Sequence, residues 1–296
     1  MAPRTTTVAF LGIGLMGSRQ AKRLLDAGYD VIAWNRSPDK AKALAPLGAR
    51  VAETAAQAAS GAPIVVTMLE NGTVVEDVLF GHGGVAAAMG GGAILVDMSS
   101  IKPAEAQDHA RRLGARGVGH VDAPVSGGTV GAEQGTLAIM AGGDAGAFGT
   151  VEPVLRAMGR PTHVGGHGAG QLAKLANQII VAVTIGAVAE ALILAERGGA
   201  DPRKVREALR GGFAESRVLE LHGERMLGRD FATKGRSVTH LKDIDNALDA
   251  ARAIGLTHTP FTAASADLFR GLLSHFGDLD HSGLFAEIER RNGLPA

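Results

Sequence analysis

Residues 7–17 read TVAFLGIGLMG, and this stretch decides the fold of the chain. It begins like a buried β-strand and continues with Gly12, Gly14 and Gly17, which have the spacing G-x-G-x-x-G. A helical pattern follows, and the next strand pattern is DVIAW at residues 30–34. Glycines with this spacing between a strand and a helix, inside a βαβ unit, predict a dinucleotide-binding fold of the Rossmann type.

The glycine loop suits a pyrophosphate for physical reasons. Glycine allows the tight turn, lets the backbone approach the ligand and permits close packing of the helix, while the first N–H groups of the helix face the anion. The alternative, a glycine-rich turn without a ligand, is disfavoured by the strand and helix on either side. We therefore expect cofactor contacts from Gly12, Ile13, Gly14, Leu15, Met16 and Gly17.

The residues after the second strand bear on cofactor preference. An enzyme that prefers NAD carries an acidic residue there, which binds the ribose hydroxyls, whereas this chain has Asn35, Arg36 and Ser37. Arg36 can pair with a 2′-phosphate and Ser37 can donate to the same group. The sequence predicts NADP(H) as the preferred cofactor, with NAD(H) possible. In the alternative, Arg36 is a solvated surface residue and Asp39 reaches the ribose.

Composition limits the other classes of function. The 296 residues are 46% hydrophobic, which suits two domains of ordinary size. Thirty basic and thirty acidic residues cancel, so no net field attracts nucleic acid or an anionic membrane, and a small molecule is the expected partner. The chain has no cysteine, which removes disulfides and thiolate chemistry and suits a cytoplasmic protein.

The pattern of elements changes near residue 166. Before it, short strand patterns alternate with alanine-rich helical patterns, which predicts a mostly parallel sheet. After it, helical patterns begin at Gln171, Pro202, Ala214, Val238 and Pro260. We expect a nucleotide-binding domain over residues 1–166 and a helical domain over residues 167–296. The expected strands are residues 6–11, 30–34, 64–68, 93–97, 120–123, 137–141 and 162–164.

The first long helix of the second part is very apolar. Residues 179–195 read IIVAVTIGAVAEALILA, with Glu190 inside the run and Lys174 shortly before it. These charges favour a buried helix over a membrane span. From Gln171 to Arg197 the helix would be about 40 Å long, and its apolar surface favours a homodimer.

Two motifs resemble those of the β-hydroxyacid dehydrogenase family: DAPVSGG at residues 122–128 and GAGQLAK at residues 168–174. The resemblance spans both parts of the chain. It implies a doubly wound N-terminal domain, a long interdomain helix that carries a catalytic lysine, and an all-helical C-terminal domain, as in relatives of 6-phosphogluconate dehydrogenase. The same fold class follows from the pattern of strands and helices.

The resemblance also implies the substrate site. Ser126, Gly127 and Gly128 would hold a substrate carboxylate, since a hydroxyl and exposed backbone N–H groups form an anion nest. The alternative is a structural turn after a strand. Lys174 would be the acid and base, because partial burial disfavours the charged form of a lysine and suits it to proton transfer. Without the motif, a lone helical lysine is usually a surface residue.

The residues after the lysine leave one question open. Asn177 is three positions after Lys174 and faces the same side of the helix, so its amide can orient the substrate or the lysine. The family often has a second asparagine at the next position, where this chain has Gln178. The sequence does not decide which of Asn177 and Gln178 contacts the substrate.

The remaining cofactor contacts are implied by the family. Met68, Leu69 and Glu70 end one strand, and Ser100 follows another, where a doubly wound sheet binds its ligand. Glu70 stands where the family commonly has proline, and Ser100 where it has threonine. Lys242 belongs to a segment that resembles the family's C-terminal KD motif, whose lysine reaches the cofactor; an exposed helical pair is the alternative.

These observations predict an NADP-dependent oxidoreductase that interconverts a short β-hydroxyacid and its semialdehyde or oxo-acid. Two alternatives remain: an enzyme like the imine reductases, which usually lack this lysine, and a non-catalytic dinucleotide-binding protein. His163 and His167 have the spacing H-x3-H but lie in a glycine loop without an obvious third ligand, so we expect no metal site.

Overall fold

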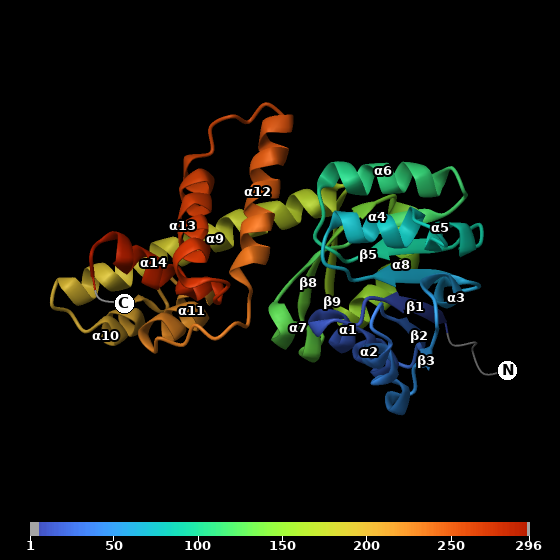
Figure 1. The fold of residues 1–296 in the computed structure, drawn as a ribbon, viewed down its shortest axis with the longest axis horizontal. Helices are drawn as coiled ribbons and strands as arrows, with labels where there is room; N and C mark the ends of the chain where they lie inside the picture. The colour runs from blue at the N-terminus through green and yellow to red at the C-terminus, as the bar shows by residue number, and fades with distance from the viewer. Residues whose placement is uncertain (1–5, 295–296) are drawn as a thin grey trace. The chain divides into compact units, whose positions relative to one another are not determined.

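The structure is a computed structural model that describes residues 6–294. The chain forms two compact units, one up to Lys174 and one from Leu175. The first unit contains a β-sheet flanked by helices, and the second is built from helices (Figure 1). The predicted fold class is confirmed: a Rossmann-type domain is followed by a long helix and then by the other helices of an all-helical domain.

The sheet of the first unit follows the doubly wound order. Its strands run β3-β2-β1-β4-β5-β6-β8-β7, and β9 pairs with β8. All neighbours are parallel except that β8 runs antiparallel to β6 and β7. The strands are β1 (Thr7–Leu11), β2 (Asp30–Trp34), β3 (Arg50–Val51), β4 (Ile64–Thr67), β5 (Ile94–Asp97), β6 (Gly119–Asp122), β7 (Val125–Ser126), β8 (Leu137–Gly143) and β9 (Gly159–Gly165).

Both faces of this sheet are covered, which explains why its central strands are almost entirely apolar. In β1, Val8 and Phe10 face one core, and Ala9 and Leu11 face the other. Helices α4, α5 and α6 lie along one face of the sheet (Figure 1). The helices of this unit are α1 (Leu15–Asp26), α2 (Pro38–Lys42), α3 (Ala55–Ala59), α4 (Gly72–Phe80), α5 (Val85–Ala88), α6 (Pro103–Gly114), α7 (Gly128–Gln134) and α8 (Ala145–Met158).

The second unit is a helical cluster around one apolar core. Buried residues from several helices meet there, among them Ile185, Ile244 and Phe269. Ser216 begins one of these helices, because its side chain accepts the N–H of Leu219. The helices are α9 (Ala169–Arg197), which starts in the first unit, α10 (Pro202–Leu209), α11 (Arg217–Leu227), α12 (Ser237–Ala253), α13 (Pro260–Phe276) and α14 (Leu284–Arg291).

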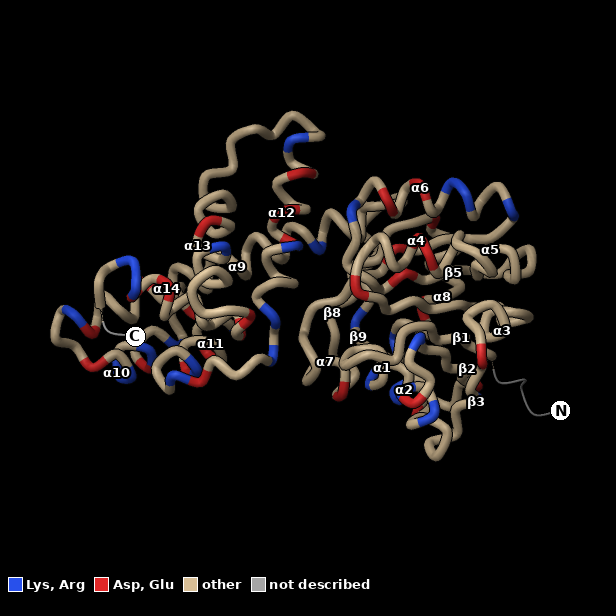
Figure 2. The backbone as a smooth tube through the Cα atoms, in the orientation of Figure 1, with Lys and Arg blue, Asp and Glu red and all other residues tan. Residues whose placement is uncertain are grey.

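Helix α9 is long and apolar enough to cross a membrane by length and composition. The structure buries 39% of its most apolar window, and core helices of soluble proteins have the same composition. Lysines and arginines alternate with acidic residues along both units in the described part of the chain (Figure 2).

The expected elements differ from the observed ones at a few places. The two-residue strands β3 and β7 were not expected, because Arg50 and Val51 are exposed and a pair of residues has no periodicity. Strand β9 begins at Gly159, earlier than expected, and includes Pro161, which edge strands tolerate. Helix α14 was also missed, and α11 begins at Arg217 rather than Ala214.

Candidate functional site

The glycine loop between β1 and α1 has the geometry that a pyrophosphate requires. Gly12 has φ of +106°, a conformation that favours glycine. A Cβ at Gly17 would lie 1.9 Å from the carbonyl oxygen of Gly12, so the loop packs directly on the helix. A Cβ at Gly14 would meet no atom within 4 Å, and no side chain caps α1. The loop therefore presents open space and helix N–H groups, which fit a dinucleotide.

The end of β2 lies beside this loop. Asn35 accepts the N–H of Ile13 at 2.9 Å and donates to the carbonyl of Ser37 at 3.0 Å, so it fixes the loop to the strand. Arg36 and Ser37 are exposed, and the hydroxyl of Ser37 does not cap α2. Within the described residues, Arg36 has no ion pair or side-chain hydrogen bond. Both side chains are available to an anionic group next to the ribose position.

A polar network joins the carboxyl ends of β4 and β5. The backbone N–H of Leu69 donates to the hydroxyl of Ser99 at 2.9 Å. One oxygen of Asp97 accepts both the Thr67 hydroxyl at 2.8 Å and the Ser99 N–H at 3.0 Å. Burial raises the pKa of Asp97, although these hydrogen bonds oppose the effect. The network holds in place the segments that carry Met68, Glu70 and Ser100. The sequence places Asp97 and Ser99 in the expected cofactor segment, whereas it does not identify Thr67.

The predicted carboxylate nest lies between β7 and α7. Ser126 pairs with Ala138 of β8 and is half-buried. Gly127 and Gly128 follow with φ of +135° and +62°, and both are exposed. These two successive glycines with positive φ begin a short helix, and no side chain caps that helix, so its first N–H groups have no side-chain cap in the described structure. The geometry suits the anion nest that the sequence predicts.

The start of α9 is bonded to the same edge of the sheet. Asp122, at the end of β6, accepts the N–H groups of Gly168 at 2.8 Å and Gln171 at 2.9 Å. The side chain of Gln171 donates to the carbonyl of Ser99 at 2.9 Å and accepts the N–H of Ile101 at 3.1 Å. Gln171 is completely buried. Asp122 and Gln171 together fix the first turn of α9. Each belongs to one of the two family motifs, but neither motif predicts this contact.

Lys174 follows Gln171 by three positions, so it lies one turn further along α9. Its exposed fraction is 9%, which is low for a lysine. A buried lysine on a helix turn that is anchored to the carboxyl edge of the sheet differs from the solvated surface residue that a lone lysine usually is.

Asn177 and Gln178 lie further along the same helix. Asn177 donates to the side-chain oxygen of Gln178 at 2.8 Å, and Gln178 donates to Asp243 of α12 at 2.8 Å. Asp243 also lies 3.3 Å from the amine of Lys242. Within the second unit, the predicted residues Asn177, Gln178 and Lys242 therefore belong to one connected network, whose link through Asp243 the sequence did not show.

The histidine pair with H-x3-H spacing is explained by local contacts. His163 bonds to the carbonyl of Gly143 at 2.7 Å and stacks on Phe148. His167 approaches His120 and Asp122 closely enough that the three could share an ion. Both oxygens of Asp122, however, already accept backbone N–H groups. Neither ring nitrogen of the buried His120 has a hydrogen-bond partner in the described structure.

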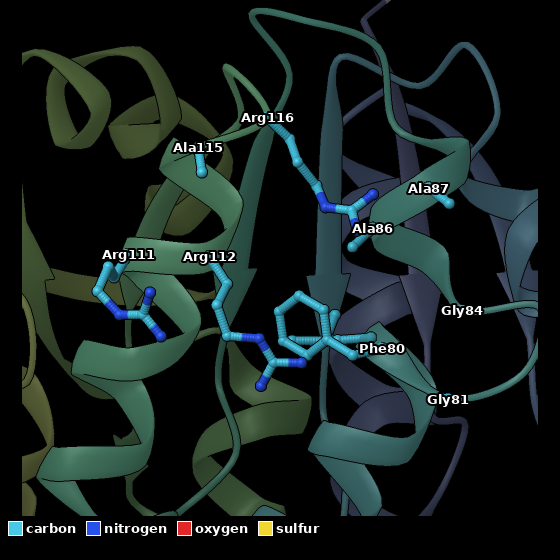
Figure 3. Close-up of a pocket in the computed structure, with 10 residues that line it drawn as sticks. Phe80, Gly81, Gly84, Ala86, Ala87, Arg111, Arg112, Ala115 and Arg116 are labelled. Carbon is cyan, nitrogen blue, oxygen red and sulfur yellow. The ribbon is translucent and has the colours of Figure 1, made fainter.

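A cavity of about 350 Å³ lies elsewhere on the first unit. The ends of α4 and α6 line it, with Phe80, Arg111, Arg112 and Arg116 around it (Figure 3). Arg112 lies 3.5 Å over the ring of Phe80, and Glu76 and Asp108 neutralise it. Since α4 and α6 begin at the carboxyl edge of the sheet, their ends lie at the opposite edge, away from the glycine loop. This cavity contains none of the predicted site residues.

Comparison with known proteins agrees with this geometry. The sequence model for the NAD binding domain of 6-phosphogluconate dehydrogenase matches residues 7–168. The model for the NAD-binding of NADP-dependent 3-hydroxyisobutyrate dehydrogenase matches residues 168–288. Together the two models cover nearly the whole described chain.

Individual relatives match over almost their full length. The 2-hydroxy-3-oxopropionate reductase of Escherichia coli is 45% identical, and the match covers 95% of this chain and 97% of the relative. The 3-hydroxyisobutyrate dehydrogenase of Pseudomonas aeruginosa is 35% identical, with 96% and 98% covered. The structure of 3-hydroxyisobutyrate dehydrogenase from Mycobacterium tuberculosis with L-serine has a TM-score of 0.87 at 32% identity, with 96% of this chain and 99% of that chain covered.

The matches span both units and include the strand–glycine loop–helix of the first and the helices of the second. They also cover the segments that carry Asp122, Ser126 and Lys174. The chain belongs to the β-hydroxyacid dehydrogenase family and is an NAD(P)-dependent hydroxyacid dehydrogenase.

Proposed function

We propose that this enzyme interconverts a short β-hydroxyacid and its semialdehyde or oxo-acid with NADP(H), and that Lys174 is the acid and base. The observation that carries the proposal is the burial of Lys174, only 9% exposed, one turn after the anchored residue Gln171. A lysine held in this way is fixed relative to the carboxyl edge of the sheet, where a doubly wound fold binds its cofactor.

The cofactor would lie over the glycine loop. Gly12 and Gly14 allow its pyrophosphate to approach the backbone, and the N-terminus of α1 faces that group. When bound, the nicotinamide supplies or accepts the hydride. The preference for NADP(H) rests on Arg36 and Ser37, which are exposed and can pair with a 2′-phosphate, and on the lack of an acidic residue at Asn35.

The substrate would bind through its carboxylate. Ser126 can donate its hydroxyl, and Gly127 and Gly128 can donate backbone N–H groups, because both glycines are exposed and no side chain caps the helix that they begin. Such a nest fixes one end of a short acid and leaves the carbon to be reduced or oxidised free to face Lys174. Asn177 and Gln178 are the candidates for a further polar contact to the substrate.

The lysine would move one proton in each direction of the reaction. During reduction, Lys174 donates a proton from Nζ to the carbonyl oxygen, so that no alkoxide accumulates. During oxidation, Nζ accepts the proton of the substrate hydroxyl. Proton transfer of this kind typically contributes a factor of about 100 to 10,000 to the rate.

The other predicted cofactor contacts are part of the same proposal: Met68, Leu69, Glu70, Ser100 and Lys242. The division into a nucleotide-binding domain over residues 1–166 and a helical domain over residues 167–296 also remains a proposal. We further propose a cytoplasmic homodimer, which agrees with the absence of cysteine and with the exposed apolar residues of α9.

The test is a panel of initial rates with NADPH and with NADH. The substrates are 2-hydroxy-3-oxopropionate, 2-methyl-3-oxopropionate, glyoxylate and a cyclic imine. Turnover of a carboxylate-bearing aldehyde, faster with NADPH, is the expected result. Turnover of the imine alone would assign C=N reduction, and no turnover of any substrate would assign a non-catalytic role.

The lysine is tested by the variant Lys174→Met. We expect kcat for the aldehyde to fall by about a thousandfold while the Kd of NADPH stays the same. The matched control is Lys204→Met, because Lys204 is an exposed lysine on α10. Equal kcat values for Lys174→Met and the control would contradict the role of Lys174.

A further inference from the structure

A relay of three side chains crosses from α9 to α12 within the second unit. The amide nitrogen of Asn177 donates to the amide oxygen of Gln178 at 2.8 Å. The amide nitrogen of Gln178 donates to Asp243 at 2.8 Å. Gln178 and Asp243 are both buried, with exposed fractions of 9% and 2%, so water does not compete strongly for these bonds.

The charge at one end fixes the direction of the whole relay. A carboxylate can only accept hydrogen bonds, so Asp243 requires the nitrogen end of the Gln178 amide to face it. The oxygen end of Gln178 must then face Asn177, which has to donate through its own nitrogen. The amine of Lys242 lies 3.3 Å from the same carboxylate. The orientation of the Asn177 amide therefore follows from Asp243.

This direction determines what Asn177 can offer to a ligand. Its nitrogen is engaged by Gln178, whereas its amide oxygen has no hydrogen-bond partner among the described residues. Asn177 is half-buried and lies one turn after Lys174 on α9. The amide oxygen, at the end of the Asn177 amide that does not bond to Gln178, is thus available as a hydrogen-bond acceptor one turn after Lys174.

We propose that Gln178 is a positioning residue, and that the relay makes Asn177 an acceptor that selects a hydroxyl group on the carbon next to the substrate carboxylate. The proposal rests on the proposed function. A 2-hydroxy semialdehyde carries such a donor, whereas a 2-methyl semialdehyde carries only a methyl group at the same carbon. The methyl group would leave the half-buried oxygen of Asn177 without a partner, which disfavours binding in the transition state.

The relay also answers the question of which amide contacts the substrate. Gln178 uses its oxygen for Asn177 and its nitrogen for Asp243, so the relay holds both ends of its amide. Asn177 keeps one end of its amide for the ligand. Gln178 acts on the substrate only through Asn177.

The experiment compares kcat/KM for 2-hydroxy-3-oxopropionate and 2-methyl-3-oxopropionate in the full-length enzyme. The wild type is expected to favour the hydroxy substrate by at least about tenfold. In Gln178→Met, which has a similar length, the side chain can neither donate to Asp243 nor accept from the Asn177 amide nitrogen. Asn177 then loses its fixed orientation, and the ratio of the two kcat/KM values is expected to fall toward one.

A second variant and a control keep the test decisive if Gln178→Met folds poorly. Asp243→Asn preserves the shape of the side chain but removes its charge. An amide at this position can donate or accept, so the amide of Gln178 can face it with either end. The ratio of the two kcat/KM values is expected to fall at least about threefold. Asp249→Asn makes the same substitution at an exposed position of α12, and the wild-type ratio is expected there.

The outcomes separate the two proposals. If the wild type reduces both aldehydes but favours the methyl substrate, the specificity inference is wrong while the proposed function stands. The same holds if Gln178→Met and Asp243→Asn lower both kcat/KM values equally and keep the ratio, because the relay is then only structural. If the wild type reduces glyoxylate but neither of these two aldehydes, the inference is wrong. If it reduces none of the three, the proposed function fails and the inference fails with it.

Discussion

The carboxylate of Asp122 accepts the backbone N–H of Gln171 at 2.9 Å, and this bond joins the end of β6 to the first turn of α9. Its other oxygen accepts the N–H of Gly168 at 2.8 Å. The approach is so close that a Cβ at Gly170 would lie 2.5 Å from the carbonyl oxygen of Asp122. Lys174, one turn further on, takes its position from this junction.

Asp122→Asn should therefore affect both stability and catalysis. An amide keeps one acceptor oxygen but points an NH2 group at a backbone N–H, so one buried donor is left unpaired. We expect the free energy of unfolding to fall by about 2 kcal/mol and kcat to fall by about tenfold, because α9 is less well fixed. Denaturant unfolding and initial rates measure the two effects. The control is Asp77→Asn, because Asp77 is an exposed carboxylate on α4. An unchanged kcat in Asp122→Asn would disprove the positioning role of Asp122.

Arg36→Ala tests the basis of the cofactor preference. If the guanidinium pairs with the 2′-phosphate, its loss removes a charge-assisted hydrogen bond that only NADPH makes. We expect kcat/KM for NADPH to fall on the order of 10- to 100-fold and kcat/KM for NADH to change little. Arg210→Ala removes an exposed arginine after α10 and serves as the control. Equal losses with both cofactors would assign Arg36 a structural role instead.

Much of the fold follows from the sequence because its signals are local. The strand Asp30–Trp34 has the bounds that its apolar pattern predicts, and the glycine loop lies where its spacing places it. Strand β7 was missed because Val125 and Ser126 form a strand only by pairing with β8, which lies further along the chain. Two residues carry no periodicity that reveals such a partner.

The same difference between local signals and distant pairings applies to the candidate site. Lys174, Asn177 and the glycines of the nest belong to contiguous motifs, which a sequence displays directly. The pairings that hold them are not displayed: Asp122 and Gln171 belong to two separate motifs and are 49 positions apart, and Gln178 and Asp243 are 65 apart. Aspartates and glutamines occur in all proteins, so only folding shows which of them meet. Supporting contacts of this kind are visible only in three dimensions.

Ile180→Glu tests the proposed dimer. Apolar residues recur along one side of α9 at 180, 183, 187, 191 and 194, and Ile180 and Leu194 are 66% and 74% exposed. A second copy of the chain would cover this stripe, and a buried, unpaired glutamate would oppose that contact. We expect light scattering to give a dimer for the wild type and a monomer for Ile180→Glu. The control is Glu190→Gln on the same helix, which is expected to remain a dimer. A monomeric wild type would overturn the prediction.

His120→Leu should stabilise the protein, and more so in acid. His120 is 2% exposed, and neither ring nitrogen has a partner in the described structure. Leucine has a similar size and no polar atom to leave unpaired, so the free energy of unfolding at pH 7 is expected to rise by about 1 kcal/mol.

The pH dependence of this variant follows from the same burial. Burial, with smaller effects of His167 and His109, lowers the pKa of His120 to about 3, whereas an unfolded histidine titrates near pH 6.5. Between these values the unfolded chain binds more protons, so the stability of the wild type falls as the pH falls from about 6.5 toward 3. The leucine variant lacks this contribution, and its advantage should grow by up to about 1.4 kcal/mol for each pH unit below 6.5.

Denaturant unfolding at pH 7.0, 6.0 and 5.0 measures this difference, with the exposed His82→Gln as the control. Part of the acid sensitivity must survive in His120→Leu, because burial also lowers the pKa of His222 to about 4. A variant that is less stable than the wild type at pH 7.0, with an unchanged pH dependence, would contradict the prediction. It would mean that the imidazole makes a favourable buried contact, for example with an ordered water molecule.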